Sequence, residues 1–222
     1  MQTIRGFRDI LPEHIPLWQK VEKEASRLFE AFGFQEIRIP IIEKTQLFAR
    51  SIGEATDIVE KEMYTFADRK GDKLTLRPEA TASIVRSYIQ HKMYATDPIR
   101  KFFMIGPMFR RERPQKGRYR QFYQIDAEVF GIESGLIDSQ LIYLLNELFK
   151  RLGLTGLFAH INSLGCPKCR PSFQKALLDF LESKKDKLCE NSLRRMDKKP
   201  VRILDCKVTG CKKAIQDAPA TL

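Results

Sequence analysis

An arginine-rich loop between two strand-like stretches constrains the fold of this chain more than any other feature. Residues 101–110 and 120–130 both have the composition of strands, and the loop between them contains Pro114 and Gly117. Successive residues of a strand point to opposite faces. In the second stretch one face carries Tyr123, Ile125, Ala127 and Val129, and the other carries Phe122, Gln124, Asp126, Glu128 and Phe130. Three polar groups on a central strand are costly unless they line a pocket, so this face is predicted to be the floor of a polar ligand site.

The charge of the loop points to an anionic partner. Between residues 110 and 120 a single acid, Glu112, stands against Arg110, Arg111, Arg113, Lys116, Arg118 and Arg120. The whole chain has a formal net charge of +11, and residues 160–222 carry 14 basic and 7 acidic side chains. Nucleic acid or nucleotide phosphate explains both concentrations. For residues 160–222 a basic, solvated surface is an equal alternative.

Hydrophobic spacing predicts the remaining elements. The patterns predict helices over residues 17–32, 81–93 and 138–152, and strands over residues 37–41, 63–66, 73–76 and 157–162. Gly33 and Gly153 are placed to end the first and last of these helices. The helices are segregated in sequence from strands that fit an antiparallel sheet. The predicted fold class is therefore α+β, with an antiparallel sheet flanked by helices.

A change of composition near Gly165 predicts a domain boundary. From Cys166 onward the sequence is rich in lysine and arginine and contains all five cysteines. We therefore expect one domain over residues 1–165 and a second, basic, Cys-containing region over residues 166–222.

The cysteines leave two possibilities open. Cys166 and Cys169 have the spacing of half a zinc site, and Cys189 follows them. The second pair would need a ligand at Ser192, although Cys206 or Cys211 is an alternative ligand. Because the count is odd and no export signal is present, free thiols in a reducing cytosol are predicted and no metal is assigned, with zinc as the alternative.

The sequence carries no membrane or export signal. No apolar run approaches the roughly 18 residues that a membrane span needs. Residues 1–7 lack the apolar segment of a secretory signal. Hydrophobic residues make up 43% of the chain, which is enough for a core and excludes wholesale disorder. A cytoplasmic protein without membrane contact is expected.

Arginines beside a strand with carboxylates suit the activation of a carboxylic acid by ATP. Arginine forks bind phosphate oxygens and neutralise charge that develops at the α-phosphorus. Carboxylates and a glutamine can orient an ammonium group. No Gly-rich phosphate loop of the Walker or Rossmann type occurs, and His14, His91 and His160 have no catalytic motif around them.

Several stretches resemble the histidyl-tRNA synthetases, a family of class II aminoacyl-tRNA synthetases. Residues 109–122, with Gln124 and residues 128–131, resemble motif 2 of that family. Residues 75–81 resemble its histidine-binding loop, and residues 32–40 resemble its motif 1, which in the family forms the dimer interface. Arg5, Gly6, Asp9, Leu11 and Pro12 resemble its N-terminal signature. The resemblance covers nearly the whole chain and implies the class II catalytic core as the fold.

The resemblance also implies site residues. Those that would bind L-histidine are Glu79, Ala80, Thr81, Arg110, Gln124 and Glu128. Those that would bind ATP are Arg110, Glu112, Arg118 and Phe122, and those that would meet the acceptor end of tRNA(His) are Arg113 and Gln115. Ala80 and Asp126 stand where the family often has glycine.

Within that set the resemblance gives each group a task. Glu79 and Thr81 would hold the α-amino group, with Gln124 helping to position the amino acid, and Glu128 would accept a hydrogen bond from the imidazole. Arg110, the catalytic residue, would bridge the α-phosphate and the substrate carboxylate. For the nucleotide, Glu112 would orient the adenine, Phe122 would stack on it and Arg118 would reach the γ-phosphate. The alternative for Glu79 and Glu128 is an ordinary buried ion pair.

The implied function is histidine–tRNA ligation with ATP and Mg²⁺ by a homodimer formed through motif 1. The family continues to roughly twice this length, and its motif 3, second histidine motif and anticodon-binding domain have no counterpart here. The chain is therefore expected to be an N-terminal fragment that is weak or inactive alone. The alternatives are a non-catalytic, synthetase-like regulatory subunit of histidine biosynthesis and an RNA-binding fragment.

Overall fold

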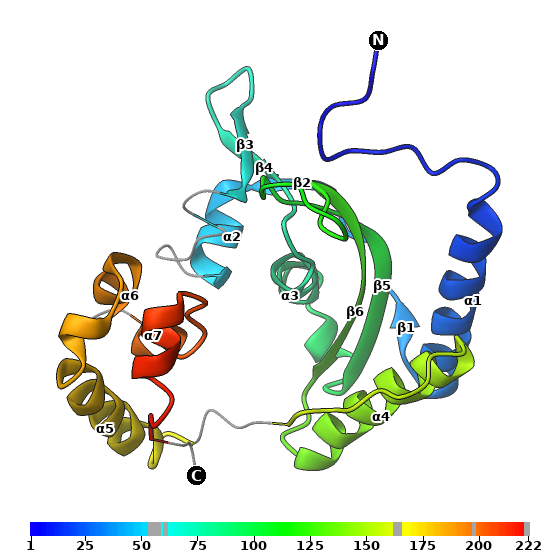
Figure 1. Cartoon of the computed structure of the whole chain (residues 1–222). Helices are drawn as coiled ribbons and strands as arrows, with labels where there is room; N and C mark the ends of the chain where they lie inside the picture. The colour runs from blue at the N-terminus through cyan, green and yellow to red at the C-terminus, as the bar shows by residue number, and fades with distance from the viewer. Residues whose placement is uncertain (53–58, 60–61, 162–165, 197–198, 220–222) are drawn as a thin grey trace. The chain divides into compact units, whose positions relative to one another are not determined.

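The computed structural model describes residues 1–52, 59, 62–161, 166–196 and 199–219. The chain divides into two compact units, Met1–Gly156 and Leu157–Leu222, which are described separately (Figure 1). The domain boundary predicted near Gly165 lies outside the described residues.

A long, curved hairpin forms the centre of the first unit (Figure 1). Its strands are β5 (Arg100–Phe109) and β6 (Gln121–Phe130), which are antiparallel with Gly106 opposite Gln124. The short strand β1 (Gln35–Glu36) pairs in parallel with the other side of β5, giving the order β1-β5-β6. Both long strands are confirmed to within one residue, whereas the parallel β1 pairing departs from the all-antiparallel expectation.

Helices cover both faces of this sheet (Figure 1). On one face α1 (Ile15–Ala31) and α4 (Gly135–Arg151) pack on Phe103, Ile125 and Ala127. On the other face α3 (Thr81–Gln90) packs through Ile84 and Tyr88 on a second cluster that contains Phe102, Met104, Met108, Phe122 and Phe130. The two faces of β6 are therefore sorted as the alternation predicts, and its polar residues lie on the α3 side.

A second three-stranded sheet lies beside α2 (Thr45–Ile52). Its order is β2-β4-β3, with β2 (Ile42–Lys44), β4 (Lys73–Leu76) and β3 (Tyr64–Ala67) all antiparallel. The β3–β4 turn is closed by Asp68, whose Oδ1 accepts from the backbone N–H groups of Lys70 and Asp72, both at 2.8 Å. The predicted hairpin is confirmed.

Two predicted strands are wrong. Over residues 37–41 the chain is outside any strand, because Nη1 of Arg77 takes the carbonyl oxygens of Ile39 (2.8 Å) and Pro40 (3.4 Å) that a neighbouring strand would use. Residues 157–161 also form no strand and pair with none among the residues that are described, and Phe158 is 86% exposed. Asn162, the end of that predicted strand, lies outside the described residues.

Two helices differ from their predicted bounds for local reasons. The predicted helix over 81–93 ends at Gln90, because Lys92 adopts a left-handed conformation (φ 50°) before the short 3-10 helix η2 (Met93–Ala95). Helix α4 begins three residues before the prediction, where the hydroxyl of Ser134 accepts a hydrogen bond from the Leu136 N–H (3.2 Å).

The second unit is helical in its described part. It contains α5 (Arg170–Glu182), η3 (Lys185–Lys187), α6 (Glu190–Arg195), η4 (Pro200–Ile203) and α7 (Thr209–Ala214). Its small core is built on Leu177, Leu181 and Ile203, which are fully buried, and on the buried thiol of Cys211.

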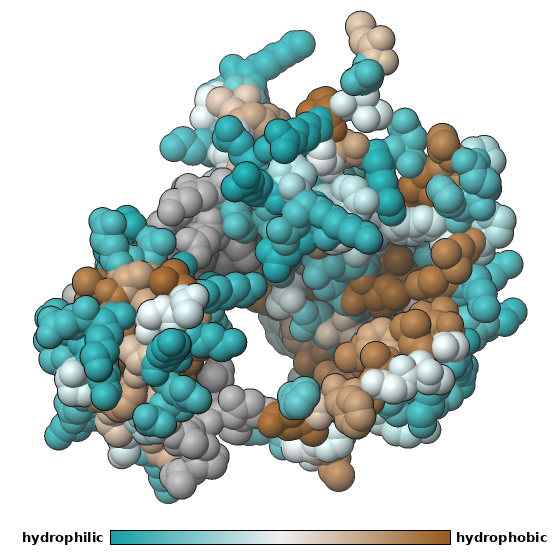
Figure 2. Space-filling view, viewed as in Figure 1, coloured by the Kyte–Doolittle hydropathy of each residue, from teal (hydrophilic) through white to brown (hydrophobic). Residues whose placement is uncertain are grey.

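The surface separates polar from apolar regions. Figure 2 shows hydrophilic side chains over the β3–β4 hairpin and apolar side chains over α4. On α4, Leu136 is 82% exposed, and Tyr143 and Leu145 are each 53% exposed. Among the described residues, no helix has both the length and the apolar character that crossing a membrane requires.

Candidate active site

The start of α3 brings three predicted histidine-binding residues together. The hydroxyl of Thr81, the first residue of the helix, donates to Oε1 of Glu128 on β6 at 2.5 Å. The Glu79 carboxylate accepts from the N–H of Ala82 at 3.1 Å and so occupies an otherwise unpaired donor of the first turn. Ala80 between them is fully buried in the core, so its side chain is a packing group and its contribution to the site is the position of the backbone.

The floor of the site is the polar face of β6. Gln124 and Asp126 lie two residues apart on this face, and their buried oxygens, Oε1 and Oδ2, find no hydrogen-bond partner among the described residues. Unpaired buried acceptors are costly unless a ligand supplies the donors. Both atoms therefore favour a ligand that carries N–H groups.

Three carboxylates share this floor, and the pKa values of two of them, Asp126 and Glu79, are raised. Burial, followed by the charges of Glu128 and Glu79, raises the pKa of Asp126 to about 6, against the opposing effect of Arg77 and Arg110. Burial also raises the pKa of Glu79, while the hydrogen bond from Ala82 acts in the other direction. A bound cation would relieve this repulsion, which makes the site suited to an ammonium group.

Arg77 supports the floor from below, a role that was not expected from the sequence. Its side chain is 4% exposed, and its Nε donates to the carbonyl of Pro107 at 2.9 Å. Burial lowers its pKa, and the charge of Asp126 raises it. A Cβ added to Gly106 would lie 2.7 Å from Nη2 of Arg77, so the glycine on β5 makes room for the guanidinium. The sequence shows an arginine at the end of a strand and a glycine on β5, but nothing in it shows that the two meet.

The arginine-rich end of the site, which suits an anionic group, begins where the hairpin strands meet the loop. Arg110 lies over the ring of Phe122, with its Cζ 5.1 Å from the ring centroid, and its Nε donates to the carbonyl of Pro78 at 2.9 Å. The Glu112 carboxylate lies between two arginines, 3.9 Å from Nη1 of Arg110 and 3.5 Å from Nη1 of Arg118. The structure thus brings together all four residues predicted to bind ATP.

The two predicted tRNA residues lie in the exposed part of the arginine-rich loop. The backbones of Gln115 and Arg118 hydrogen-bond to each other, which closes a tight turn over Lys116 and Gly117. Arg113 and Gln115 are both exposed. They are therefore accessible to a large partner and separate from the half-buried floor.

The N-terminal segment fixes the base of this loop, which was not expected from the sequence. The carbonyl of Gly6 accepts from the Arg120 N–H at 2.7 Å, and Nε of Arg120 donates to the carbonyl of Glu112 at 3.2 Å. The Arg8 guanidinium lies over the Tyr119 ring, 4.5 Å from its centroid. The sequence signal for this contact was the glycine at position 6. In the structure Gly6 adopts φ +91° next to the side chain of Arg120.

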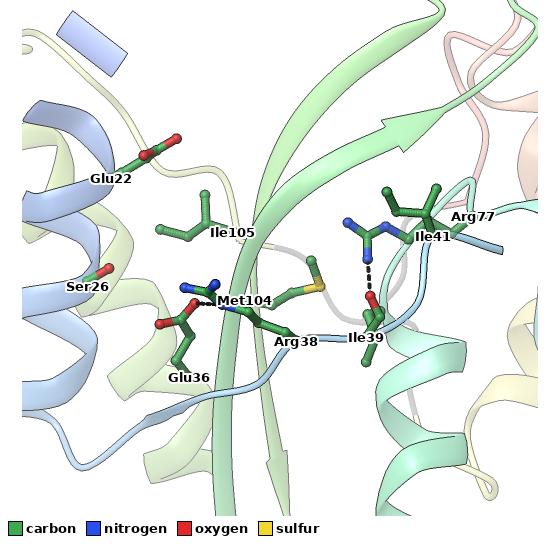
Figure 3. A pocket seen from close by; sticks show the side chains of 9 residues that line it. All are labelled: Glu22, Ser26, Glu36, Arg38, Ile39, Ile41, Arg77, Met104 and Ile105. Carbon is green, nitrogen blue, oxygen red and sulfur yellow. Dashed lines mark hydrogen bonds and ion pairs between the residues drawn. The ribbon is translucent and has the colours of Figure 1, made fainter. Parts of the chain in front are cut away.

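A cavity of about 450 Å³ lies on the other side of Arg77, which is one of the residues that line it (Figure 3). Glu22 and Ser26 of α1 line it on one side, and Met104 and Ile105 of β5 on the other. Arg38 crosses it and pairs with Glu36, with 2.8 Å between Nε and Oε1. None of the predicted ligand-binding residues lines this cavity, which instead borders the segment that resembles motif 1.

Comparisons with known proteins agree on one family. A family model described as histidyl-tRNA synthetase matches residues 6–217. The histidine–tRNA ligase of Desulforapulum autotrophicum is 74% identical over 222 residues, and that of Desulfatibacillum aliphaticivorans is 60% identical over 220 residues. The matches cover 100% and 99% of this chain, but only 52% of each relative, so the chain spans about half the length of these relatives.

Solved structures give the same answer for the fold. The apo histidyl-tRNA synthetase of S. aureus superposes with a TM-score of 0.73 at 33% identity, covering 100% of this chain and 56% of that one. A protein from Bacillus halodurans, described as an ATP phosphoribosyltransferase regulatory subunit/histidyl-tRNA synthetase, superposes with a TM-score of 0.68 at 18% identity. The match covers 99% of this chain and 52% of that one, and at this identity it supports the fold alone. With an α+β core, a clustered set of predicted site residues and a family match over most of its length, the chain belongs to the histidyl-tRNA synthetase family.

Proposed function

We propose that this chain supplies the histidine- and ATP-binding half of a histidine–tRNA ligase. The observation that carries the proposal is the juxtaposition of a carboxylate-rich floor (Glu79 before α3, Asp126 and Glu128 on β6) and an arginine pair (Arg110, Arg118) at the loop end of the same hairpin. From Phe122 to Glu128 the strand spans about 20 Å at the usual rise per residue, which is room for an amino acid and a nucleotide end to end.

The amino acid would bind over the floor. Its ammonium group would donate to Glu79 and to the unpaired Oε1 of Gln124, which removes a desolvation cost in both partners. Glu128 already accepts from Thr81 and has a second oxygen that would accept from the imidazole N–H. An aliphatic side chain would leave that oxygen without a donor, which is the source of selectivity.

Activation would take place between the floor and the loop, with MgATP as the second substrate. A carboxylate oxygen of histidine attacks the α-phosphorus, and the bond from that phosphorus to the bridging oxygen breaks, releasing pyrophosphate. Arg110 would contact both reacting groups and neutralise the charge that develops. Its Nε bond to Pro78 and its contact with Phe122 hold it in place beforehand. Glu112 would meet the adenine, Phe122 would stack on it, and Arg118 would reach the γ-phosphate.

The other proposed partners follow from exposed regions. Arg113 and Gln115 on the loop would contact the acceptor end of tRNA(His), since they are accessible and close in sequence to Arg110. A second copy of the chain would cover the face around residues 32–41, where Ile41 is 44% exposed beside the cavity of Figure 3. We place this activity in the cytoplasm, where histidine, ATP and tRNA meet.

The regulatory alternative has one structural argument against it. Such a protein has no need of a phosphate-binding arginine pair, yet Arg110 and Arg118 are both held at Glu112. An RNA-binding fragment would likewise have no use for the buried, unpaired acceptors of Gln124 and Asp126.

Calorimetric titration with a non-hydrolysable histidyl-adenylate analogue tests the proposal. The 222-residue chain should bind it, and the same analogue carrying alanine in place of histidine should bind at least tenfold more weakly. Arg110→Ala should weaken binding at least tenfold. Arg27→Ala, on the exposed surface of α1, is the matched control and should have no effect. Equal affinity for both analogues would contradict the assignment of histidine as the substrate.

A further inference from the structure

Three cysteines from three short segments meet in the second unit. The Sγ atoms of Cys189, Cys206 and Cys211 all lie within 4.8 Å of one another, and those of Cys189 and Cys206 are 3.8 Å apart. They come from the residue before α6, the segment after η4 and the first turn of α7. Cys211 is buried, and the other two are half-buried.

The distance between Cys189 and Cys206 is that of two ligands around a tetrahedral metal ion, and the Sγ of Cys211 lies within 4.8 Å of both. Zinc binds cysteine sulfur at about 2.3 Å in tetrahedral geometry, so neighbouring sulfurs lie about 3.8 Å apart. The Cys189–Cys206 distance equals that value. Three thiolates also select zinc over magnesium or calcium, which prefer oxygen ligands.

The fourth corner is marked by Ser192. Its side chain is 2% exposed, and its Oγ lies 3.4 Å from Sγ of Cys189 and 3.8 Å from Sγ of Cys211. The oxygen therefore stands at ligand-to-ligand distance from two of the three sulfurs. A zinc ion at the centre would have three sulfur ligands and one oxygen ligand, the serine hydroxyl or a water beside it.

We propose that the second unit binds one Zn²⁺ ion through Cys189, Cys206 and Cys211, with an oxygen at the Ser192 corner as the fourth ligand. The backbone N–H of Cys189 donates to Sγ of Cys211 at 2.8 Å, an outer contact of the kind that stabilises a coordinated thiolate. The proposal replaces the prediction of free thiols for these three cysteines.

The ion would act as a structural cross-link. The core of this unit is small, and its described elements are short helices joined by irregular segments. A metal that joins three of these segments stabilises a small unit that its hydrophobic core alone supports weakly. Zinc removal should therefore loosen the second unit and leave the hairpin of the first unit folded.

Cys166 and Cys169 provide an internal control. Their sulfurs are 3.5 Å apart, but Cys166 is exposed, and neither joins a cluster of three or more ligands among the described residues. The double variant Cys166→Ser/Cys169→Ser should keep the metal. If that variant loses zinc while Cys206→Ser retains it, the site has been placed wrongly.

Metal content and chelator competition test the proposal on the 222-residue chain. Protein purified under reducing conditions should contain about one zinc per chain by mass spectrometry of the metal, and Cys206→Ser or Cys211→Ser should lose it. Two results would overturn the proposal: a chain that holds no zinc after dialysis against one equivalent of Zn²⁺, or a purified chain that contains iron instead of zinc.

A gain-of-affinity variant keeps the test sharp even if the cysteine variants misfold. Ser192→Cys replaces the oxygen ligand at the Ser192 corner by a fourth sulfur and should lower the zinc dissociation constant at least tenfold. Cobalt substitution should then give stronger thiolate-to-metal charge-transfer absorption than in the parent chain. An unchanged affinity and spectrum would show that Ser192 does not face a metal.

Discussion

Asp126 is the side chain whose protonation couples the site to the stability of the fold. Its pKa is raised to about 6 on folding, from an ordinary value of 3.8. A carboxyl of this kind stabilises the folded state fully below its ordinary pKa, and that contribution is lost as the pH rises through about 6. The contribution of Asp126 to the free energy of unfolding should therefore fall between pH 4 and pH 7.

Asp126→Asn tests the coupling. The variant should be more stable than the parent at pH 7 by about 1 kcal/mol, once solvent screening of this partly exposed group is allowed for. The difference should vanish near pH 4, as followed by urea denaturation at both pH values. Asp179→Asn on the exposed side of α5 is the control. A stability difference between variant and parent that grows as the pH falls would contradict the upward shift of the Asp126 pKa.

Glu128 is the residue on which selectivity depends. Glu128→Ala should abolish the preference for histidine, at a cost of about 1–3 kcal/mol in binding, because the imidazole donor would face a desolvated wall. The measurement is the ratio of affinities for the histidyl and alanyl adenylate analogues. Glu133→Ala, just after the end of β6, serves as control. Unchanged selectivity would remove Glu128 from the site.

The arginine-rich loop is an element held at its base by the N-terminal segment. Gly6 adopts φ +91°, and a Cβ there would lie 2.8 Å from Cγ and Cδ of Arg120. Those atoms cannot swing away freely, because Arg120 is tied to the carbonyls of Glu112 and Arg5. The orientation of the loop that carries Glu112 and Arg118 therefore depends on a glycine about a hundred residues away in sequence.

Gly6→Ala should release this loop, and Gly117→Ala provides the comparison. Both positions have positive φ, so both variants suffer about 1 kcal/mol of backbone strain, but a Cβ at Gly117 meets nothing within 4 Å. Gly6→Ala should lose more stability in urea and should become more sensitive to trypsin at the loop arginines. Equal behaviour of the two variants would show that the Arg120 contact has no effect.

At the scale of elements, the sequence predicts what depends on local pattern. The hairpin of β5 and β6 follows from alternation, and α1 and α4 follow from apolar spacing with glycine at their ends. Residues 37–41 have the same alternation, but a distant arginine takes their carbonyl groups. The mostly apolar residues 157–161 predict a strand, but a strand also needs a neighbouring strand with which its backbone can pair. Side-chain and long-range partners of the backbone are what local pattern cannot reveal.

The same distinction holds for the site. The positions of Gln124, Asp126 and Glu128 on one face were predictable, because side chains alternate between the two faces of a strand. The support from Arg77 was not, because it depends on where the end of β4 meets β5 in space. The meeting of Cys189, Cys206 and Cys211 was not predictable either, since it depends on how three short segments of the second unit pack together.

At the scale of the whole molecule, the chain matches about half of its relatives' length. The resemblance implies that motif 3 and the second histidine motif, each with an arginine of the adenylation site, lie in the other half of those relatives. Loss of one such electrostatic group commonly lowers the rate about 100- to 1,000-fold. The 222-residue chain should therefore catalyse ATP–pyrophosphate exchange at least 100-fold more slowly than the Desulforapulum autotrophicum relative under identical conditions. Activity within tenfold of that relative would show that the chain suffices.

Arg77 has a consequence for how the first unit opens. Its backbone N–H donates to Ile41 (2.8 Å), its carbonyl accepts from Phe109 (3.0 Å), and its guanidinium holds Ile39, Pro40 and Pro107. One residue thus joins the end of β4 to β5 and to the segment before β2. The two sheets cannot fluctuate apart without breaking the bonds of Arg77 to Phe109 and Pro107 on β5. Native-state hydrogen exchange at the amides of Arg77 and Phe109 should therefore report a single opening event, shared by both sheets.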